Sequence, residues 1–299
     1  MHELSEEIKK LFQYDSTLPF DYADKIIKQE NGIALHDINY ASPKTGKVTA
    51  YLILPSNRKP VAGFIIGHWG LGTRTQYIPE AKSYAKAGIA CLLLDFPWVR
   101  PAPWRQRIGN YTKPEIDYEV YIQAVVDIRR SIDLLQNLTS IQVQKIACIG
   151  HSIGAQCGCI ATAIDPRIQA FVVVGGVPST ESVFIESDDP DIVGFRNMFK
   201  KEDLDKYFTT MRVFDPINYV SYISPRPILF QFARFERYFG EKAMNEYYSA
   251  AYQPKVVKWY DTGHELNDFP VMFDRAQWLQ KHLRIKGLVT ALRKAARLS

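Results

Sequence analysis

Short apolar runs alternate with longer segments of helical spacing along most of the 299-residue chain. This alternation restricts the fold more than any other feature, because it is typical of α/β proteins in which helices cover a largely parallel sheet. Most of the later runs are uniformly apolar, as strands buried on both faces require. The expected strands are residues 34–40, 48–54, 63–66, 89–94, 145–149, 170–174, 227–232 and 256–260, and the first two are expected to pair antiparallel.

Helices are expected between these strands. A capping box at 112–115 predicts the start of the longest one, whose apolar stripe continues to Leu138. Further helices are expected over 80–87 and 269–283. The segment 178–220 breaks the alternation, since it begins with acidic residues and then becomes aromatic and basic. We interpret it as a small cap inserted into a single domain spanning residues 1–299, with a basic C-terminal tail at 284–299.

The sequence Gly-His-Ser-Ile-Gly at 150–154 fits the G-x-S-x-G motif of a nucleophile elbow. In that motif a serine lies on a sharp turn between a strand and a helix, and the flanking glycines leave room for neighbouring backbone. An apolar run leads directly into this motif, and small residues that suit close helix packing follow it. The alternative is a glycine-flanked serine in an ordinary turn. The context favours Ser152 as a nucleophile.

A serine nucleophile needs a base, and the base needs an acid that orients it. His264 follows the last expected strand, at the end of a sheet where α/β proteins place their sites. Glu236 is the first carboxylate after the preceding expected strand. Asp261 and Asp268 are nearer to His264 in sequence, but such local carboxylates more often cap turns. We therefore expect His264 as the base and Glu236 as its partner.

Two backbone N–H groups should stabilise the negative charge that develops on the substrate. One is expected from Ile153, directly after the nucleophile. The other should come from the glycine-rich stretch 67–72, where Trp69 is the first choice and Gly70 the alternative. Phosphate binding by this stretch is disfavoured, because it lacks the residues of a P-loop and of a dinucleotide-binding motif.

With these motifs in this order, the chain resembles the α/β-hydrolase superfamily, and within it the dienelactone hydrolase-like and prolyl-oligopeptidase-like serine hydrolases. The resemblance covers roughly residues 33–283 and departs from the usual pattern at Trp69, where glycine is common, and at Glu236, where aspartate is usual. It implies a mostly parallel eight-stranded sheet with helices on both faces. It also implies hydrolysis of a carboxylic ester or related acyl bond. From the residues themselves we expect a Ser-His-Glu triad that needs no metal or organic cofactor. The residues that carry the resemblance are 67–70, 93–97, 150–154, 227–230 leading to Glu236, and 263–264.

The loop at 96–107 combines two tryptophans, three prolines and three arginines. Tryptophans provide apolar walls, and arginines bind carboxylates through paired hydrogen bonds. One hypothesis is a substrate pocket for a group of aromatic or anionic character, built from Trp98, Arg100, Trp104 and Arg234. The alternative is that these arginines, and Arg237, which flanks Glu236 as Arg234 does, pair with the acidic residues at 188–191.

Charge placement limits the partners. The chain has 37 Lys and Arg against 32 Asp and Glu, a net charge of +5, but six of the basic residues and none of the acidic ones lie in 281–299. The remaining 31 basic and 32 acidic residues make a nearly neutral body, which disfavours nucleic-acid binding. The amphipathic segment 288–298 would either lie on an anionic membrane surface or form a terminal helix with its charges in water.

No run reaches the roughly 18 apolar residues of a spanning helix. The four cysteines match neither a zinc site nor a disulfide framework, so we expect reduced core thiols in a cytoplasmic protein. A small-molecule ester is the expected substrate, and the oligomeric state stays open. The alternatives are a peptidase or thioesterase with the same triad, or a ligand-binding protein on a hydrolase scaffold. About 30 residues before the first expected strand are too few for the propeller of such peptidases.

Overall fold

A computed structural model describes residues 4–138 and 145–296, with the strands joined in one nine-stranded sheet. The strands follow the order β1-β2-β3-β5-β4-β6-β7-β8-β9. The pairs β1–β2, β2–β3 and β3–β5 are antiparallel and the others are parallel. Their bounds are β1 Ala23–Glu30, β2 Ile33–Ala41, β3 Lys47–Pro55, β4 Ala62–Gly67, β5 Ile89–Leu94, β6 Ile146–His151, β7 Ile168–Val174, β8 Ile228–Ala233 and β9 Lys255–Tyr260.

All eight expected strands are present, but the expected number of eight is wrong because β1 adds a ninth. Its sequence, Ala-Asp-Lys-Ile-Ile-Lys-Gln-Glu, is charged, and seven of its eight residues are exposed. An edge strand pairs on one side only and packs little side-chain surface, so it lacks the apolar signal of the inner strands. Inner strands such as β4 and β5 are buried at every position.

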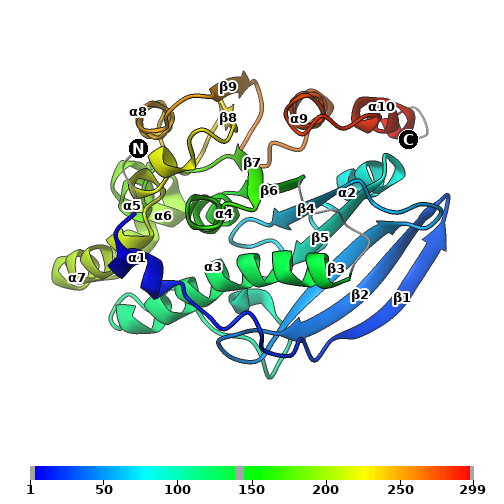
Figure 1. Cartoon of the computed structure of the whole chain (residues 1–299). Coiled ribbons are helices and arrows are strands. Elements are labelled where there is room, and N and C mark those ends of the chain that lie inside the picture. Colours follow the sequence, from blue (N-terminus) through cyan, green and yellow to red (C-terminus); the bar gives the residue numbers. More distant parts are fainter. Residues whose placement is uncertain (1–3, 139–144, 297–299) are drawn as a thin grey trace.

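Helices cover both faces of the sheet (Figure 1). On one face, α2, α9 and α10 pack in one core, and on the other α3, α4 and α8 pack in a second. Adjacent residues of β4 alternate between these cores, with Ile65 in one and Phe64 and Ile66 in the other. The helices are α1 Glu6–Leu11, α2 Ile78–Lys86, α3 Pro114–Asn137, α4 Ile153–Ile164, α5 Thr180–Glu186, α6 Pro190–Arg196, α7 Lys201–Met211, α8 Glu241–Ala250, α9 Phe269–His282 and α10 Leu288–Ala296, with short 3-10 helices η1 Pro97–Val99, η2 Arg212–Phe214, η3 Pro216–Asn218 and η4 Val220–Ile223.

None of the helices in the described ranges is long and apolar enough to cross a membrane. The amphipathic C-terminal helix α10 instead packs against α2 and α9, with Leu288 and Leu292 buried and Arg293 and Lys294 exposed. Its apolar face is therefore part of the core.

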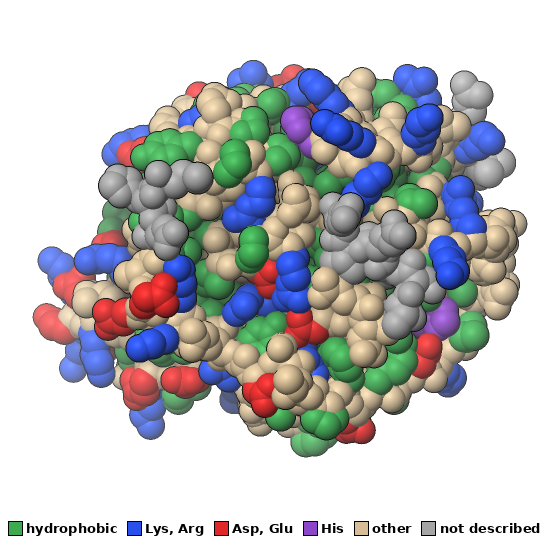
Figure 2. All heavy atoms as spheres, in the orientation of Figure 1, with side chains coloured by type: hydrophobic (Ala, Val, Ile, Leu, Met, Phe, Trp, Pro, Cys, Tyr) green, Lys and Arg blue, Asp and Glu red, His purple; other side chains and the backbone are tan. Residues whose placement is uncertain are grey.

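The segment predicted to be a cap contains α5, α6, α7, η2 and η3, all placed between β7 and β8. In α7, Leu204 and Tyr207 are buried, while the exposed residues are charged except for Thr209. Figure 2 shows the side chains of both signs gathered over the α7 end of the molecule. We refer to α5, α6 and α7 as the cap helices.

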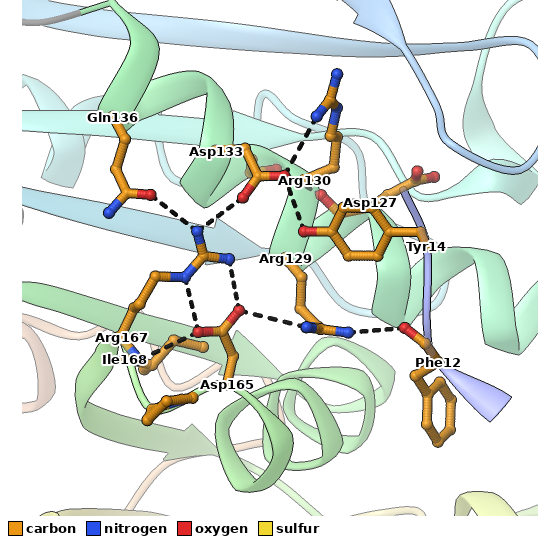
Figure 3. Close-up of polar contacts among 12 residues, drawn as sticks. Phe12, Tyr14, Asp127, Arg129, Arg130, Asp133, Gln136, Asp165, Arg167 and Ile168 are labelled. Atoms are coloured by element: carbon orange, nitrogen blue, oxygen red, sulfur yellow. Dashed lines mark hydrogen bonds and ion pairs between the residues drawn. The ribbon is translucent and has the colours of Figure 1, made fainter. Parts of the chain in front are cut away.

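A polar network joins α3 to segments before and after it in the chain (Figure 3). Arg129 on α3 donates to the Phe12 carbonyl at 2.7 Å and to Asp165 at 3.3 Å. Arg167, in the loop after α4, donates to Asp165 and, at 2.7 Å, to Asp133 on α3. This network fixes the N-terminal segment against the helices that carry the site described below.

The start of α3 differs from the prediction. Its N-cap is Lys113, without a capping side chain, so the predicted capping box at 112–115 is wrong. In the first turn of α3, the carboxylate of Asp117 accepts the N–H groups of Gly109 and Asn110 in the preceding loop. Tyr207 of the cap helices also donates to it at 2.8 Å.

Candidate active site

Ser152 occupies the single residue between β6 and α4, and its backbone is in an unusual conformation. Its φ is +55° and its ψ is −119°. A non-glycine residue at positive φ is costly, and such strain persists where the surrounding structure holds it. Both flanking glycines are necessary here: a Cβ at Gly154 would lie 2.5 Å from the His68 carbonyl oxygen, and one at Gly150 would lie 2.6 Å from the Ala155 nitrogen. The turn therefore has the geometry of a nucleophile elbow.

His264 and Glu236 come together from the loops that follow β9 and β8. The His264 Nδ1 lies 2.7 Å from Glu236 Oε2, and both side chains are only 2% exposed. The second carboxylate oxygen of Glu236 accepts the Tyr238 N–H at 3.1 Å. With Nδ1 bonded to the carboxylate, His264 Nε2 is left as the free ring nitrogen; it is buried and has no hydrogen-bond partner within the described part of the chain.

The glycine-rich loop after β4 is held by hydrogen bonds on several sides. The Phe96 N–H donates to His68 Nε2 at 3.1 Å, so His68 Nδ1 carries the proton and donates it to the Trp69 carbonyl at 2.6 Å. Burial lowers the pKa of His68 to about 4, which keeps this tautomer neutral. The indole N–H of Trp98 donates to the Gly70 carbonyl at 3.0 Å.

The Trp69 N–H is already occupied. It donates to Gln76 Oε1 at 3.1 Å. No hydrogen bond from the N–H groups of Gly70 or Ile153 occurs among the described residues. Ile153 is the first residue of α4, and the first N–H groups of a helix have no partner within it. Gly70 and Ile153, which line the same cavity as Ser152, thus each have an unoccupied N–H donor.

Gln76 and His151 connect this loop to His264, and sequence reasoning missed both. Gln76 Nε2 donates to His151 Nδ1 at 2.6 Å, and His151 Nε2 donates to the His264 carbonyl at 2.8 Å. Burial holds the pKa of His151 well below its usual range, so the ring is neutral, as this pair of bonds requires. The position of His151 inside the elbow motif is the one signal in the sequence that pointed to it.

Solved structures resemble this chain over most of its length. The acetyl xylan esterase from Paenibacillus sp. R4 shares 20% identity, with 93% of this chain and 92% of that chain covered at a TM-score of 0.76. Acetyl xylan esterase 1 from Thermoanaerobacterium sp. JW/SL YS485 shares 15% sequence identity, with 95% of each chain covered and a TM-score of 0.71. An α/β hydrolase from Penicillium sp. sh18 shares 16% sequence identity, with 90% of this chain and 100% of that chain covered and a TM-score of 0.59. No protein-family model and no curated protein matches the sequence.

The chain has the α/β-hydrolase fold.

Ser152, Glu236 and His264 all follow the carboxyl ends of parallel strands, where ligands bind in open α/β sheets. Ser152 and His264 line one cavity of about 520 Å³. Among the described residues, no three His, Cys, Asp or Glu side chains are grouped so that they could hold a metal ion. The cavity is lined by Trp69, Gly70, Leu71, Ile108, Gly109, Tyr111, Tyr121, Ser152, Ile153, Gln156, Val177, Thr180, Val183, Phe184, Ile192, Phe195, Tyr207, Tyr238, Phe239 and His264.

The four residues predicted to bind substrate are not among those that line the cavity. Arg100 is fully buried and pairs with Asp127 at 2.6 Å, and Trp98 stacks on Phe96 behind the glycine-rich loop. Trp104 packs against Gly46, and Arg234 is more than half exposed and pairs with Asp261 at 3.2 Å.

The alternative prediction, that these arginines pair with the acidic residues at 188–191, is confirmed for one of them, Arg237. Arg237 lies 2.7 Å from Asp189 and 3.4 Å from Asp191.

Proposed function

We propose that this α/β-hydrolase is a serine hydrolase that cleaves a carboxylic ester of a small molecule through an acyl-enzyme. The observation that carries the proposal is the buried pair of His264 and Glu236, which leaves His264 Nε2 free at the cavity that also contains Ser152. This is the geometry that a base and its orienting acid need in a serine triad. Structural similarity to solved esterases supports ester hydrolysis over other acyl transfers.

In the proposed mechanism, Ser152 Oγ attacks the acyl carbon while His264 Nε2 takes the hydroxyl proton. The carboxylate of Glu236 holds the ring in the required tautomer and stabilises the imidazolium. The tetrahedral intermediate places its negative oxygen between the N–H groups of Ile153 and Gly70. We choose Gly70 over Trp69 because the Trp69 N–H already donates to Gln76.

The intermediate collapses when the C–O bond to the alcohol breaks, and His264 returns the proton to the departing alcohol oxygen. Water then attacks the acyl carbon while His264 takes a proton from it. His264 returns this proton to Ser152 Oγ as the bond between Oγ and the acyl carbon breaks, and the carboxylic acid leaves as product. Each bond formed is matched by one broken, and no further reactant is needed.

Activity and labelling together test the proposal. The wild type is expected to hydrolyse p-nitrophenyl acetate with a burst of nitrophenol and to react covalently with a fluorophosphonate probe. Ser152→Ala should abolish both, whereas Ser249→Ala, at an exposed serine on α8, should leave both unchanged. Undiminished turnover by Ser152→Ala would end the nucleophile assignment.

The same assay separates the alternatives. Faster turnover of a matched thioester or anilide than of the ester would favour a thioesterase or peptidase. A protein that neither turns over any of the three nor reacts with the probe would be a binding protein on a hydrolase scaffold.

A further inference from the structure

We infer that the cavity takes an uncharged, bulky apolar group of the ester, aromatic or branched, in preference to a carbohydrate or a carboxylate-bearing group. The inference rests on the proposed function and adds the substrate class. It follows from what the cavity walls consist of, from what their polar groups already bind, and from where the nearby charges lie.

Aromatic rings from the cap helices form one wall. Tyr111 packs against Phe184 on α5, Phe195 on α6 and Tyr207 on α7, with ring centroids 5.3, 5.0 and 4.4 Å apart. All four rings line the cavity. Rings packed in this way present a rigid apolar surface. Binding an apolar group to this surface is favourable, because it removes apolar area from water.

Two polar side chains of the cavity, Tyr207 and Gln156, already donate hydrogen bonds within the protein. The Tyr207 hydroxyl donates to Asp117 at 2.8 Å. Gln156 Nε2 donates to Thr180 Oγ1 and to the Phe214 carbonyl, both at 3.1 Å. A sugar hydroxyl that entered would lose water and find these two donors already engaged, which is unfavourable.

Charged side chains do not line this cavity. None of its lining residues within the described chain is Asp, Glu, Lys or Arg, and the nearby Arg237 is committed to Asp189 and Asp191. A carboxylate would enter without a counter-ion. The cavity therefore does not support the hypothesis of an anionic substrate group that the arginine-rich loop suggested. Its aromatic lining does support the other half of that hypothesis, an aromatic substrate group.

The volume also exceeds what an acetyl group needs. A cavity of about 520 Å³ lies within the range that accommodates drug-sized ligands. Each additional methylene that the cavity buries is expected to raise kcat/KM by about fourfold, until the cavity is full.

Two ester series test the substrate class, each normalised to the rate of hydroxide-catalysed hydrolysis. In the first, p-nitrophenyl acetate, butyrate, hexanoate and 3-phenylpropionate vary the acyl group. In the second, 2-naphthyl acetate, acetylated methyl xyloside, methyl 4-acetoxybenzoate and 4-acetoxybenzoate vary the alcohol. We expect the normalised kcat/KM to rise with the apolar size of the varied group in at least one series. We also expect the normalised kcat/KM of the neutral methyl 4-acetoxybenzoate to exceed that of its anionic analogue by at least about tenfold. A flat profile in both series, or a preference for the sugar or anionic ester, would overturn the inference.

Variants locate the effect. Phe195→Ala should lower the ratio of kcat/KM for 3-phenylpropionate over acetate by at least about tenfold, because it removes part of the aromatic wall. Phe269→Ala removes the same side chain from a partly exposed position on α9 outside the cavity and should leave the ratio unchanged. If the two variants had the same ratio of kcat/KM for 3-phenylpropionate over acetate, Phe195 would not be part of the substrate-binding wall.

Calorimetric binding to Ser152→Ala separates this inference from the proposed function. If the wild type hydrolyses no ester but Ser152→Ala binds the 3-phenylpropionate ester, the function fails and the ligand class stands. If Ser152-dependent hydrolysis occurs without binding or rate preference for apolar groups, the function stands and the inference fails.

Discussion

Replacing Glu236 with glutamine removes the charge of the proposed triad acid while keeping its shape. The carboxylate lies 2.7 Å from His264 Nδ1, and both side chains are 2% exposed. The variant amide retains an oxygen that can accept the Tyr238 N–H, so the loop should keep its conformation. The change therefore isolates the electrostatic part of the interaction.

The expected loss follows from the geometry. When His264 accepts the Ser152 proton, it becomes a cation beside the carboxylate. Unit charges about 4 Å apart at an effective dielectric constant of about 20 attract by about 4 kcal/mol. Each 1.36 kcal/mol changes a rate by about tenfold, so kcat should fall by about 10³. If the amide NH₂ also donates to Nδ1 and reverses the tautomer, the loss approaches about 10⁴.

Steady-state hydrolysis of p-nitrophenyl acetate, with active sites counted by the burst, measures this loss. Asp261→Asn is the matched control, because Asp261 is the other carboxylate near His264 in sequence, yet it is 79% exposed and pairs with Arg234. Its kcat should stay within about twofold of the wild type, since exposed pairs contribute little. A loss below tenfold for Glu236→Gln, or an equal loss for Asp261→Asn, would refute the assignment of the acid.

Three further substitutions test other parts of the structure. Burial raises the pKa of Asp215 to about 7, so between about pH 4 and 7 the folded protein holds a proton that the unfolded chain has released. The free energy of unfolding should therefore fall by at most about 4 kcal/mol as the pH rises through this window. Urea titrations at pH 5 and 8 should show this fall in the wild type and not in Asp215→Asn. Gly154→Ala should destabilise the fold by about 1–3 kcal/mol in thermal unfolding and depress esterase activity, because its Cβ would meet the His68 carbonyl oxygen at 2.5 Å; wild-type values of both would contradict the close packing of the elbow. Leu292→Asp should cost at least about 3 kcal/mol of stability in denaturant unfolding, whereas Lys294→Asp on the exposed side of α10 should cost almost none.

The sequence predicted the inner sheet well because burial on both faces leaves an unambiguous apolar run. It failed at β1, where an exposed edge strand has no such pattern, and at the start of α3. There the capping sequence was present, but the helix has Lys113 as its N-cap without a capping side chain, and a carboxylate of its first turn, that of Asp117, accepts the N–H groups of the preceding loop. Local motifs compete with tertiary partners, and only the structure reveals which bond forms.

The proposed catalytic residues were identifiable for a similar reason. Ser152, Glu236 and His264 each follow an apolar strand, so their places in the fold came from the strand pattern and from a turn motif that glycine spacing specifies. The proposed substrate residues had no such support. Composition indicated that arginines were near the site, but whether Arg100 faces a ligand or a buried partner depends on Asp127, which lies 27 residues away on α3.

His151 illustrates why neutrality of the surrounding groups matters to the proposed chemistry. Its ring centroid is 5.0 Å from that of His264, and it bonds to the His264 carbonyl. A positive charge at this distance would oppose the charge that His264 acquires during the attack by about 3 kcal/mol at an effective dielectric constant of about 20. Burial prevents this, because it holds the pKa of His151 well below its usual range. The hydrogen bond from Gln76 to His151 Nδ1 requires the same neutral ring, so the bonds that fix the loop and the electrostatics that favour proton transfer depend on one protonation state.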